Sequence, residues 1–159
     1  MSINQEEMLE SIKNYIDSKI SAEEKLRKTA KLLKEEVDHY NWVGFYLAEE
    51  SNSLILGPFS GEPTEHTEID FGEGICGQAA EKEETFLIQD VSKEENYLSC
   101  SPEVDSEIVI PIFDNDKIIG EIDIDSHQIS PFNIDDEKFL EEIADLLTDT
   151  VKSYLDESI

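Results

Sequence analysis

The sequence is poor in positive charge, in cysteine and in long hydrophobic runs. Its 159 residues include 12 Lys and Arg against 39 Asp and Glu, which gives a formal net charge of −27 at pH 7. Nucleic acids and anionic membranes are bound through concentrated Lys and Arg, so this composition argues against both as partners. An acidic surface that stays solvated in salt explains the charge more simply than a specific cationic partner does.

No apolar run approaches the roughly 20 residues that span a bilayer, and the start MSINQEEMLE is too acidic and polar for a signal peptide. We therefore expect a cytoplasmic protein. The two cysteines, Cys76 and Cys100, form no CxxC pair and no zinc-type Cys/His spacing, so we expect no metal and no other cofactor. Permanent disulfides are rare in a reducing cytoplasm, which leaves the two thiols as either inert packing groups or reactive ones.

The length, with 38% hydrophobic and 32% charged residues, is typical of one folded domain over residues 1–159. Residues 1–40 are expected to form N-terminal helices. Residues 41–159 are expected to form the sheet, the ligand loops and a C-terminal helix.

Three segments have helical periodicity. Residues 5–19 and 135–155 each place apolar side chains on one face, and Ser21 followed by Glu24 is a capping-box signature for a helix between them. The expected C-terminal stripe consists of Leu140, Ile143, Ala144, Leu147 and Val151.

The middle of the chain has the pattern of strands. The runs WVGFYLA and SLILGPF flank the turn EESN, and EIVIPIF and KIIGEIDID flank DND, which predicts two hairpins. TFLIQDV is a further expected strand, and the glycines of FGEGICGQAAEK predict a tight turn leading into a short helix. These elements predict an α+β fold with a mostly antiparallel sheet. The terminal helices would cover one face and leave the other for loops and a ligand.

The second hairpin carries the most informative acidic residues. A three-residue turn DND would set Glu107 opposite Asp123 and Val109 opposite Glu121, with Asp125 two residues further on. Side chains alternate along a strand, so Glu107, Asp123 and Asp125 would share one face. Like charges opposite one another destabilise a sheet. The cluster is therefore a solvated acidic face, a site for an amine, calcium or magnesium, or a carboxyl whose raised pKa makes it a general acid.

Cys100 lies in the polar loop YLSCSPEV, next to a proline. Free cysteines are usually buried and inert, but a loop of small polar residues indicates exposure. Glu107 follows seven residues later, so the thiol and the carboxylates can lie close together. A nucleophile beside a proton donor is typical of reductive or transfer chemistry.

Five blocks of the sequence resemble the free methionine-(R)-sulfoxide reductases, enzymes built on a single GAF domain. The blocks are NWVGFYL, LGPFSGEP, FGEGICG, SEIVIPI and IGEIDIDS, in the family's order and spacing. The resemblance extends from residue 41 to the C-terminal helix. It implies a GAF fold, a homodimer, free methionine sulfoxide as substrate and a thioredoxin-like thiol reductant.

The resemblance also implies roles for the cysteines. Cys100 matches the catalytic cysteine, and Cys76 matches a second family cysteine. The Cys100 thiolate would attack the sulfoxide sulfur while an acid such as Glu107 protonates the oxygen, leaving a sulfenic acid that a second thiol reduces. The family's usual resolving cysteine is absent from GEPTEHTEIDFG, where Glu65 and His66 stand instead. Either Cys76 or an external thiol would then complete the cycle.

The substrate-binding positions of the family match Glu107, Asp123 and Asp125, which would hold the ammonium group. Trp42 and Tyr46 match the aromatic residues that hold the methyl-sulfinyl end, although their spacing also suits ordinary core packing. The alternative function is a GAF module that binds a small molecule without chemistry. Such sensors usually sit beside an output domain, for which this chain has no room.

Overall fold

The structure is a computed structural model that describes residues 3–98 and 102–157. Its helices are α1 (Gln5–Asp17), α2 (Ala22–Glu36), α3 (Gly74–Lys82), the 3-10 turn η1 (Val91–Lys93), α4 (Ile134–Leu146) and α5 (Thr148–Glu157). Its strands are β1 (Trp42–Glu49), β2 (Ser53–Ser60), β3 (Glu68–Asp70), β4 (Phe86–Ile88), β5 (Ser106–Asp114) and β6 (Lys117–Ser126). Cys100 lies outside the described residues.

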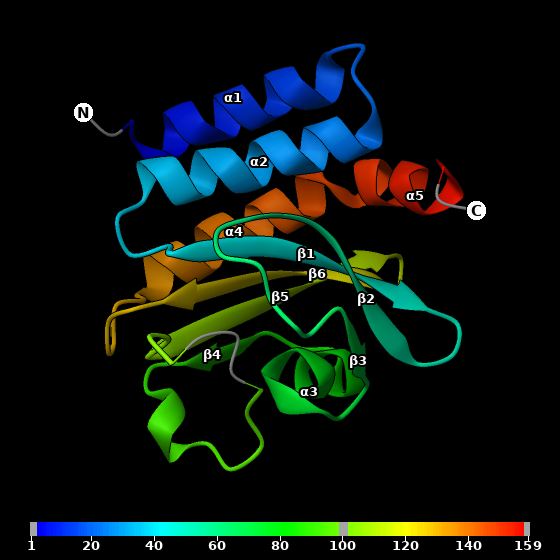
Figure 1. Cartoon of the computed structure of the whole chain (residues 1–159). Helices are drawn as coiled ribbons and strands as arrows, with labels where there is room; N and C mark the ends of the chain where they lie inside the picture. Colours follow the sequence, from blue (N-terminus) through cyan, green and yellow to red (C-terminus); the bar gives the residue numbers. More distant parts are fainter. Residues whose placement is uncertain (1–2, 99–101, 158–159) are drawn as a thin grey trace.

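One six-stranded sheet in the order β3-β2-β1-β6-β5-β4 forms the centre of the molecule, and every neighbouring pair is antiparallel. Figure 1 shows α1, α2, α4 and α5 on one face of this sheet and α3 on the other. Each face has its own buried hydrophobic cluster. The predicted α+β fold, with terminal helices on one face, is confirmed.

The first helices begin where the sequence predicts them. The Ser21 hydroxyl accepts a hydrogen bond from the Glu24 backbone N–H at 3.1 Å, which caps α2. The C-terminal helix differs from the prediction because it is divided at Leu147. There the Thr148 hydroxyl donates to the Phe113 carbonyl oxygen at 3.1 Å, which holds the start of α5 against the end of β5. The predicted stripe is nevertheless buried along both halves.

The register of the β5–β6 hairpin differs from the prediction. Glu107 lies opposite Asp125, not Asp123, and Asp123 lies opposite Val109. Only residues 115 and 116 separate the two strands, and the register shifts once between Ile112 and the next residue. Together these changes move the pairing by two residues. Because side chains alternate with a period of two, the carboxylates keep their predicted face.

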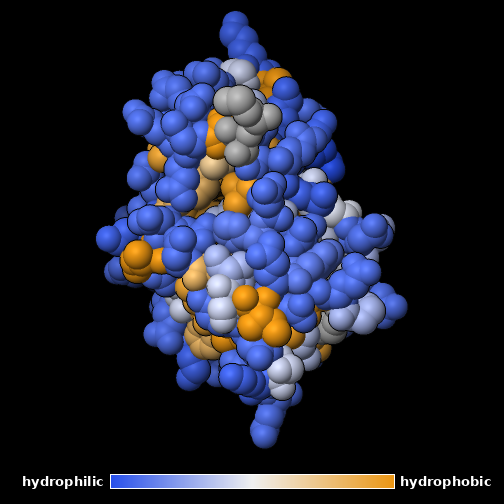
Figure 2. Space-filling view, turned by 90° about the vertical axis from the view of Figure 1, so that its left-hand side faces the viewer, coloured by the Kyte–Doolittle hydropathy of each residue, from blue (hydrophilic) through white to orange (hydrophobic). Residues whose placement is uncertain are grey.

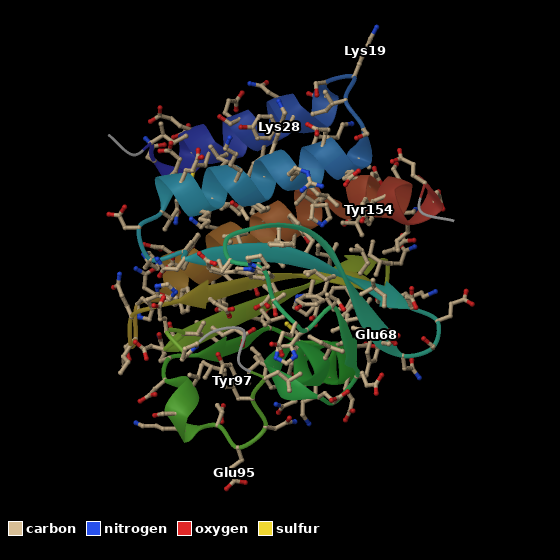
Figure 3. All side chains as sticks on the ribbon, viewed as in Figure 1. Lys19, Lys28, Glu68, Glu95, Tyr97 and Tyr154 are labelled. Atoms are coloured by element: carbon tan, nitrogen blue, oxygen red, sulfur yellow. The ribbon has the colours of Figure 1, made fainter. Side chains whose placement is uncertain are left out.

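The surface reflects the acidic composition. Figure 2 shows a face covered mostly by hydrophilic residues, with apolar patches that are small and separate. In Figure 3 the side chains of Lys19 and Glu95 extend into solvent at opposite ends of the molecule. Within the described part of the chain, no helix combines the length and apolar character needed to cross a bilayer.

Candidate active site

The face of the sheet that packs against α3 carries a row of buried acidic side chains. Glu121, Asp123 and Asp125 alternate along β6 with two isoleucines that point into the opposite core. Their exposed fractions are 0%, 1% and 2%, and that of Glu107 on β5 is 5%. A solvated strand face would leave these groups accessible to water, so that interpretation of the acidic cluster is wrong.

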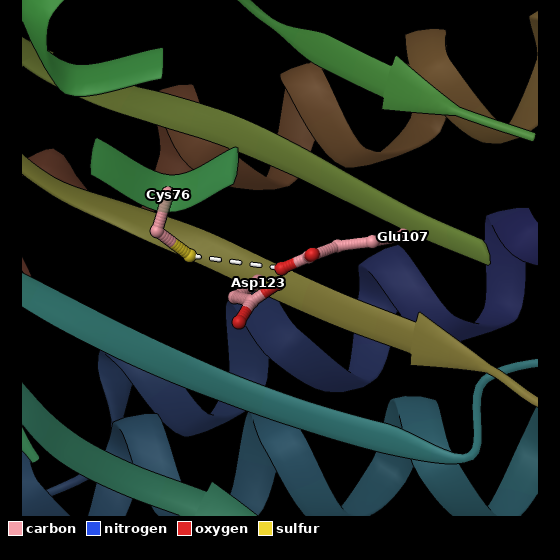
Figure 4. A group of neighbouring side chains, drawn as sticks. All are labelled: Cys76, Glu107 and Asp123. Carbon is pink, nitrogen blue, oxygen red and sulfur yellow. Dashed lines mark hydrogen bonds between the residues drawn. The ribbon is translucent and has the colours of Figure 1, made fainter. Parts of the chain in front are cut away.

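Helix α3 brings a thiol to this row. Its two glycines allow a close approach: Gly74 has φ +61°, and a Cβ on Gly77 would lie 2.5 Å from the Asp70 carbonyl oxygen. The helix therefore sits tightly on the turn before it, and Cys76 points toward the sheet. Its Sγ donates to Glu107 Oε2 at 3.7 Å, as drawn in Figure 4.

Cys76, Glu107 and Asp123 form one group. One ligand-type atom from each lies within 4.8 Å of the other two, and all three residues are buried (Figure 4). They come from α3, β5 and β6, which are brought together only by the tertiary fold. Tyr46 lines the same small cavity from β1, and its hydroxyl donates to the His66 carbonyl oxygen at 2.7 Å.

The electrostatics of this group disfavour negative charge. Burial raises the pKa of the Cys76 thiol well above its usual value, and the charges of Asp123, Glu107 and Glu121 raise it further. Burial and the Asp123 carboxylate likewise raise the pKa of Glu121, and burial raises the pKa of Asp123. No Lys or Arg stands among the described residues that line the cavity. The site is thus prepared for a cation or for bound protons.

Several oxygens in this group have no hydrogen-bond partner. Among the described residues, no hydrogen bond of good geometry reaches either carboxyl oxygen of Glu121 or Asp123 Oδ1, although the Cys76 thiol lies near both side chains. Unpaired buried polar atoms are rare and costly in folded proteins, at roughly 1–3 kcal/mol each. Of these residues Asp123 lines the cavity, so its Oδ1 is the oxygen that a ligand there can reach.

The cavity itself is narrow. About 10 Å³ remains between its lining residues, which is about the space of one water molecule. Asn96 holds the turn that leads into α3, because its side chain accepts from the Gly74 backbone N–H at 2.8 Å and donates to the Gly72 carbonyl oxygen at 2.7 Å. Leu98 packs directly on Gly74, because a Cβ there would lie 2.9 Å from its Cγ.

Two of the predicted binding residues line a neighbouring cavity of about 40 Å³. Trp42 and Asp125 lie there together, at opposed positions of β1 and β6. The indole N–H donates to the Glu62 carbonyl oxygen at 2.8 Å, and the ring stacks on Phe59. The same ring covers Gly44, where a Cβ would lie 2.3 Å from it. Gly44 pairs with Asp123, so the indole extends toward the first cavity.

The structure therefore brings together Cys76, Glu107, Asp123 and Tyr46, and it puts Trp42 and Asp125 beside them. The roles predicted for these residues and for Cys100 stay predictions. Glu121 was not among the predicted site residues, although the alternation in IGEIDID assigns it to the same face as Asp123.

The comparisons with known proteins agree with this architecture. A family described as "GAF domain" matches residues 20–152. The chain belongs to the GAF domain family. Over 110 residues, this GAF domain is 46% identical to the free methionine-R-sulfoxide reductase of Saccharomyces cerevisiae. That match covers 67% of the chain and 61% of the yeast protein.

Two solved structures extend the similarity over most of the GAF domain. The free methionine-R-sulfoxide reductase of Neisseria meningitidis, solved with its substrate, is 36% identical with a TM-score of 0.86, covering 94% of this chain and 89% of that one. The type II enzyme of Thermoplasma acidophilum is 41% identical with a TM-score of 0.79, covering 82% and 92%. The resemblance seen in the five sequence blocks is confirmed.

Proposed function

We propose that this GAF domain reduces free methionine (R)-sulfoxide to methionine at the expense of a thiol. The observation that carries the proposal is the convergence of buried Glu107 and Asp123 carboxyls on one cavity, in a chain whose relatives bear the name of that reductase. An anionic ligand would be repelled by such a site. The ammonium group of a free amino acid supplies both the positive charge and the missing N–H donors.

In this proposal Asp123 Oδ1, which lacks a donor among the described residues, accepts from the substrate ammonium. Glu107 lies close enough to Asp123 to accept a hydrogen bond from the same ammonium group. A methionine sulfoxide within a peptide has no ammonium there and would leave Asp123 Oδ1 without a donor, so it is excluded. Because about 10 Å³ is too little for an amino acid, binding also requires that side chains such as Leu98 move aside.

The chemical step uses the Cys100 thiolate as nucleophile on the sulfoxide sulfur. This attack forms a bond between the Cys100 sulfur and the substrate sulfur, and the substrate oxygen takes a proton from a carboxyl of the cluster. The hydroxyl group then passes to the Cys100 sulfur as the substrate's sulfur–oxygen bond and the new sulfur–sulfur bond break, and methionine leaves with the electron pair. The oxygen stays on Cys100 as a sulfenic acid, so cysteine sulfur is oxidised while substrate sulfur is reduced. Two further thiols then return Cys100 to the thiol and release the oxygen as water, forming one disulfide.

An external thiol is a better candidate than Cys76 for reducing the Cys100 sulfenic acid. The attacking species in thiol–disulfide chemistry is the thiolate, and the surroundings of Cys76 oppose its formation through burial and three neighbouring carboxyls. Cys76 is also 4% exposed. We therefore assign it to the lining of the ammonium site. A thioredoxin-like reductant, a homodimer and a cytoplasmic location stay predictions.

The decisive assay uses the separated (R) and (S) epimers of free methionine sulfoxide with a dithiol reductant. We expect turnover of the (R) epimer only, and its loss in Cys100→Ser. A folded protein that turns over neither epimer would refute the reductase. A sensor would instead bind the free amino acid with no methionine released, so calorimetry with the same ligand separates the two functions.

Cys76→Ser tests the recovery step. If an external thiol acts on Cys100, this variant keeps multiple turnovers with a small dithiol. Release of one methionine per chain followed by arrest would assign the resolving role to Cys76.

A further inference from the structure

The group formed by Cys76, Glu107 and Asp123 has the donor atoms of a transition-metal site. A thiol and two carboxyls meet within 4.8 Å of one another, and a cavity of about 10 Å³ adjoins them. This volume suits one small ion or one water molecule. The residues are buried, so a metal ion here would be shielded from competing solvent.

The spacing agrees with tetrahedral coordination. With zinc–sulfur and zinc–oxygen bonds of about 2.3 and 2.1 Å, a sulfur and an oxygen ligand stand about 3.6 Å apart. Cys76 Sγ and Glu107 Oε2 are 3.7 Å apart. One carboxylate oxygen of Asp123 lies within 4.8 Å of the ligand atoms of both partners.

A second observation points to a cationic ligand. Asp123 Oδ1 and both oxygens of Glu121 are buried and have no hydrogen-bond partner among the described residues. Glu121 lies two residues before Asp123 on β6, on the same face of the sheet. The protein therefore holds more acidic groups around this cavity than its own donors neutralise.

We propose that Cys76, Glu107 and Asp123 bind a divalent ion of the zinc type, with three protein ligands and a fourth position open to water. A thiolate ligand favours zinc or cobalt(II) over calcium and magnesium, which prefer oxygen donors throughout. This inference departs from the sequence-based expectation of no metal. The ion would occupy the place of the substrate ammonium and so inhibit the enzyme, a consequence that rests on the proposed function.

Zinc and cobalt(II) alone serve as probes on the full chain. Competition with a chromophoric chelator should give one tightly bound zinc per chain. Cobalt(II) in its place should produce the near-ultraviolet absorption of a thiolate–cobalt bond, which exposed carboxylates of this acidic protein cannot give. Zinc binding without that absorption would overturn the proposal.

Three variants identify the ligands. Cys76→Ser should abolish the thiolate–cobalt absorption and weaken zinc binding at least about tenfold, and Asp123→Asn should weaken it comparably. Cys100→Ser is the matched control and should keep both signals. Loss of the absorption in Cys100→Ser with retention in Cys76→Ser would refute the site. Since Cys76→Ser can fail to fold, Asp123→Asn gives an independent result.

Displacement by free methionine sulfoxide separates this inference from the proposed function. If zinc binds and the amino acid displaces it, both stand. If zinc binds but the amino acid never displaces it, the ammonium assignment fails and the metal site stands. If the (R) epimer is reduced but neither ion binds, the metal site alone is refuted.

Discussion

Replacing Glu121 by Gln should make the protein more stable at neutral pH. The carboxyl is fully buried, it has no hydrogen-bond partner among the described residues, and burial raises its pKa well above the usual 4.5. The unfolded chain loses this proton near pH 4.5, whereas the folded protein keeps it. The contribution of Glu121 to stability is therefore complete below pH 4.5 and declines as the pH rises toward the folded-state pKa.

The size of the effect follows from this linkage. Each pH unit in that window costs about 1.4 kcal/mol of unfolding free energy for as long as the buried carboxyl stays protonated. Over the pH range in which the folded protein keeps this proton and the unfolded chain has lost it, the wild type should therefore lose stability on account of this one group. Gln has the same shape and no titration, so Glu121→Gln escapes the loss. For a chain of this length, each kcal/mol of that difference corresponds to about 2–4 °C in Tm.

Urea unfolding at pH 5.5 and 7.5 measures the difference, with fluorescence of Trp42, the one tryptophan, as the signal. Contributions from groups common to both proteins cancel in the comparison. Glu95→Gln is the matched control, because Glu95 extends into solvent (Figure 3), and it should follow the wild type at both pH values. If the wild type and Glu121→Gln change in parallel with pH, Glu121 is ionised in the folded protein and our account of the site is wrong.

Three further outcomes are expected. In a Cys100→Ser variant, iodoacetamide at pH 8 should modify Cys76 far more slowly than it modifies a small free thiol, as measured by mass spectrometry. Rapid labelling would contradict the burial and the raised pKa of the Cys76 thiol. Gly44→Ala should displace the Trp42 ring, lower stability by about 1–3 kcal/mol in urea unfolding and weaken substrate binding; an unchanged fluorescence spectrum would contradict the 2.3 Å approach. Asp136→Ala should lower the free energy of unfolding by about 2–4 kcal/mol, because this side chain both caps α4 and accepts a hydrogen bond from the Tyr40 hydroxyl at 2.5 Å. A decrease below about 1 kcal/mol in urea unfolding would show that these two interactions contribute little to stability.

Local sequence patterns were enough to predict much of the secondary structure of this protein. Helix starts such as Ser21, the two hairpins and the buried C-terminal stripe follow from caps, turns and periodicity, all of which act over a few residues. The face of Asp123 and Asp125 was also correct, although the pairing was shifted by two residues. An even shift leaves every side chain on its own face, so the prediction survived an error in the turn.

The tertiary structure alone decided what the acidic residues do. Cys76 contacts Glu107 although the two residues are 31 positions apart and share no local sequence pattern. The full burial of Glu121 likewise follows from packing and not from its own strand. The same packing separated Asp125 and Trp42 from the cavity of Asp123. Sequence periodicity gives the direction of a side chain from its strand, but the helix laid over that face determines which groups lose water. That loss of water raises the pKa of Glu121 and Asp123, which the sequence pattern alone does not predict.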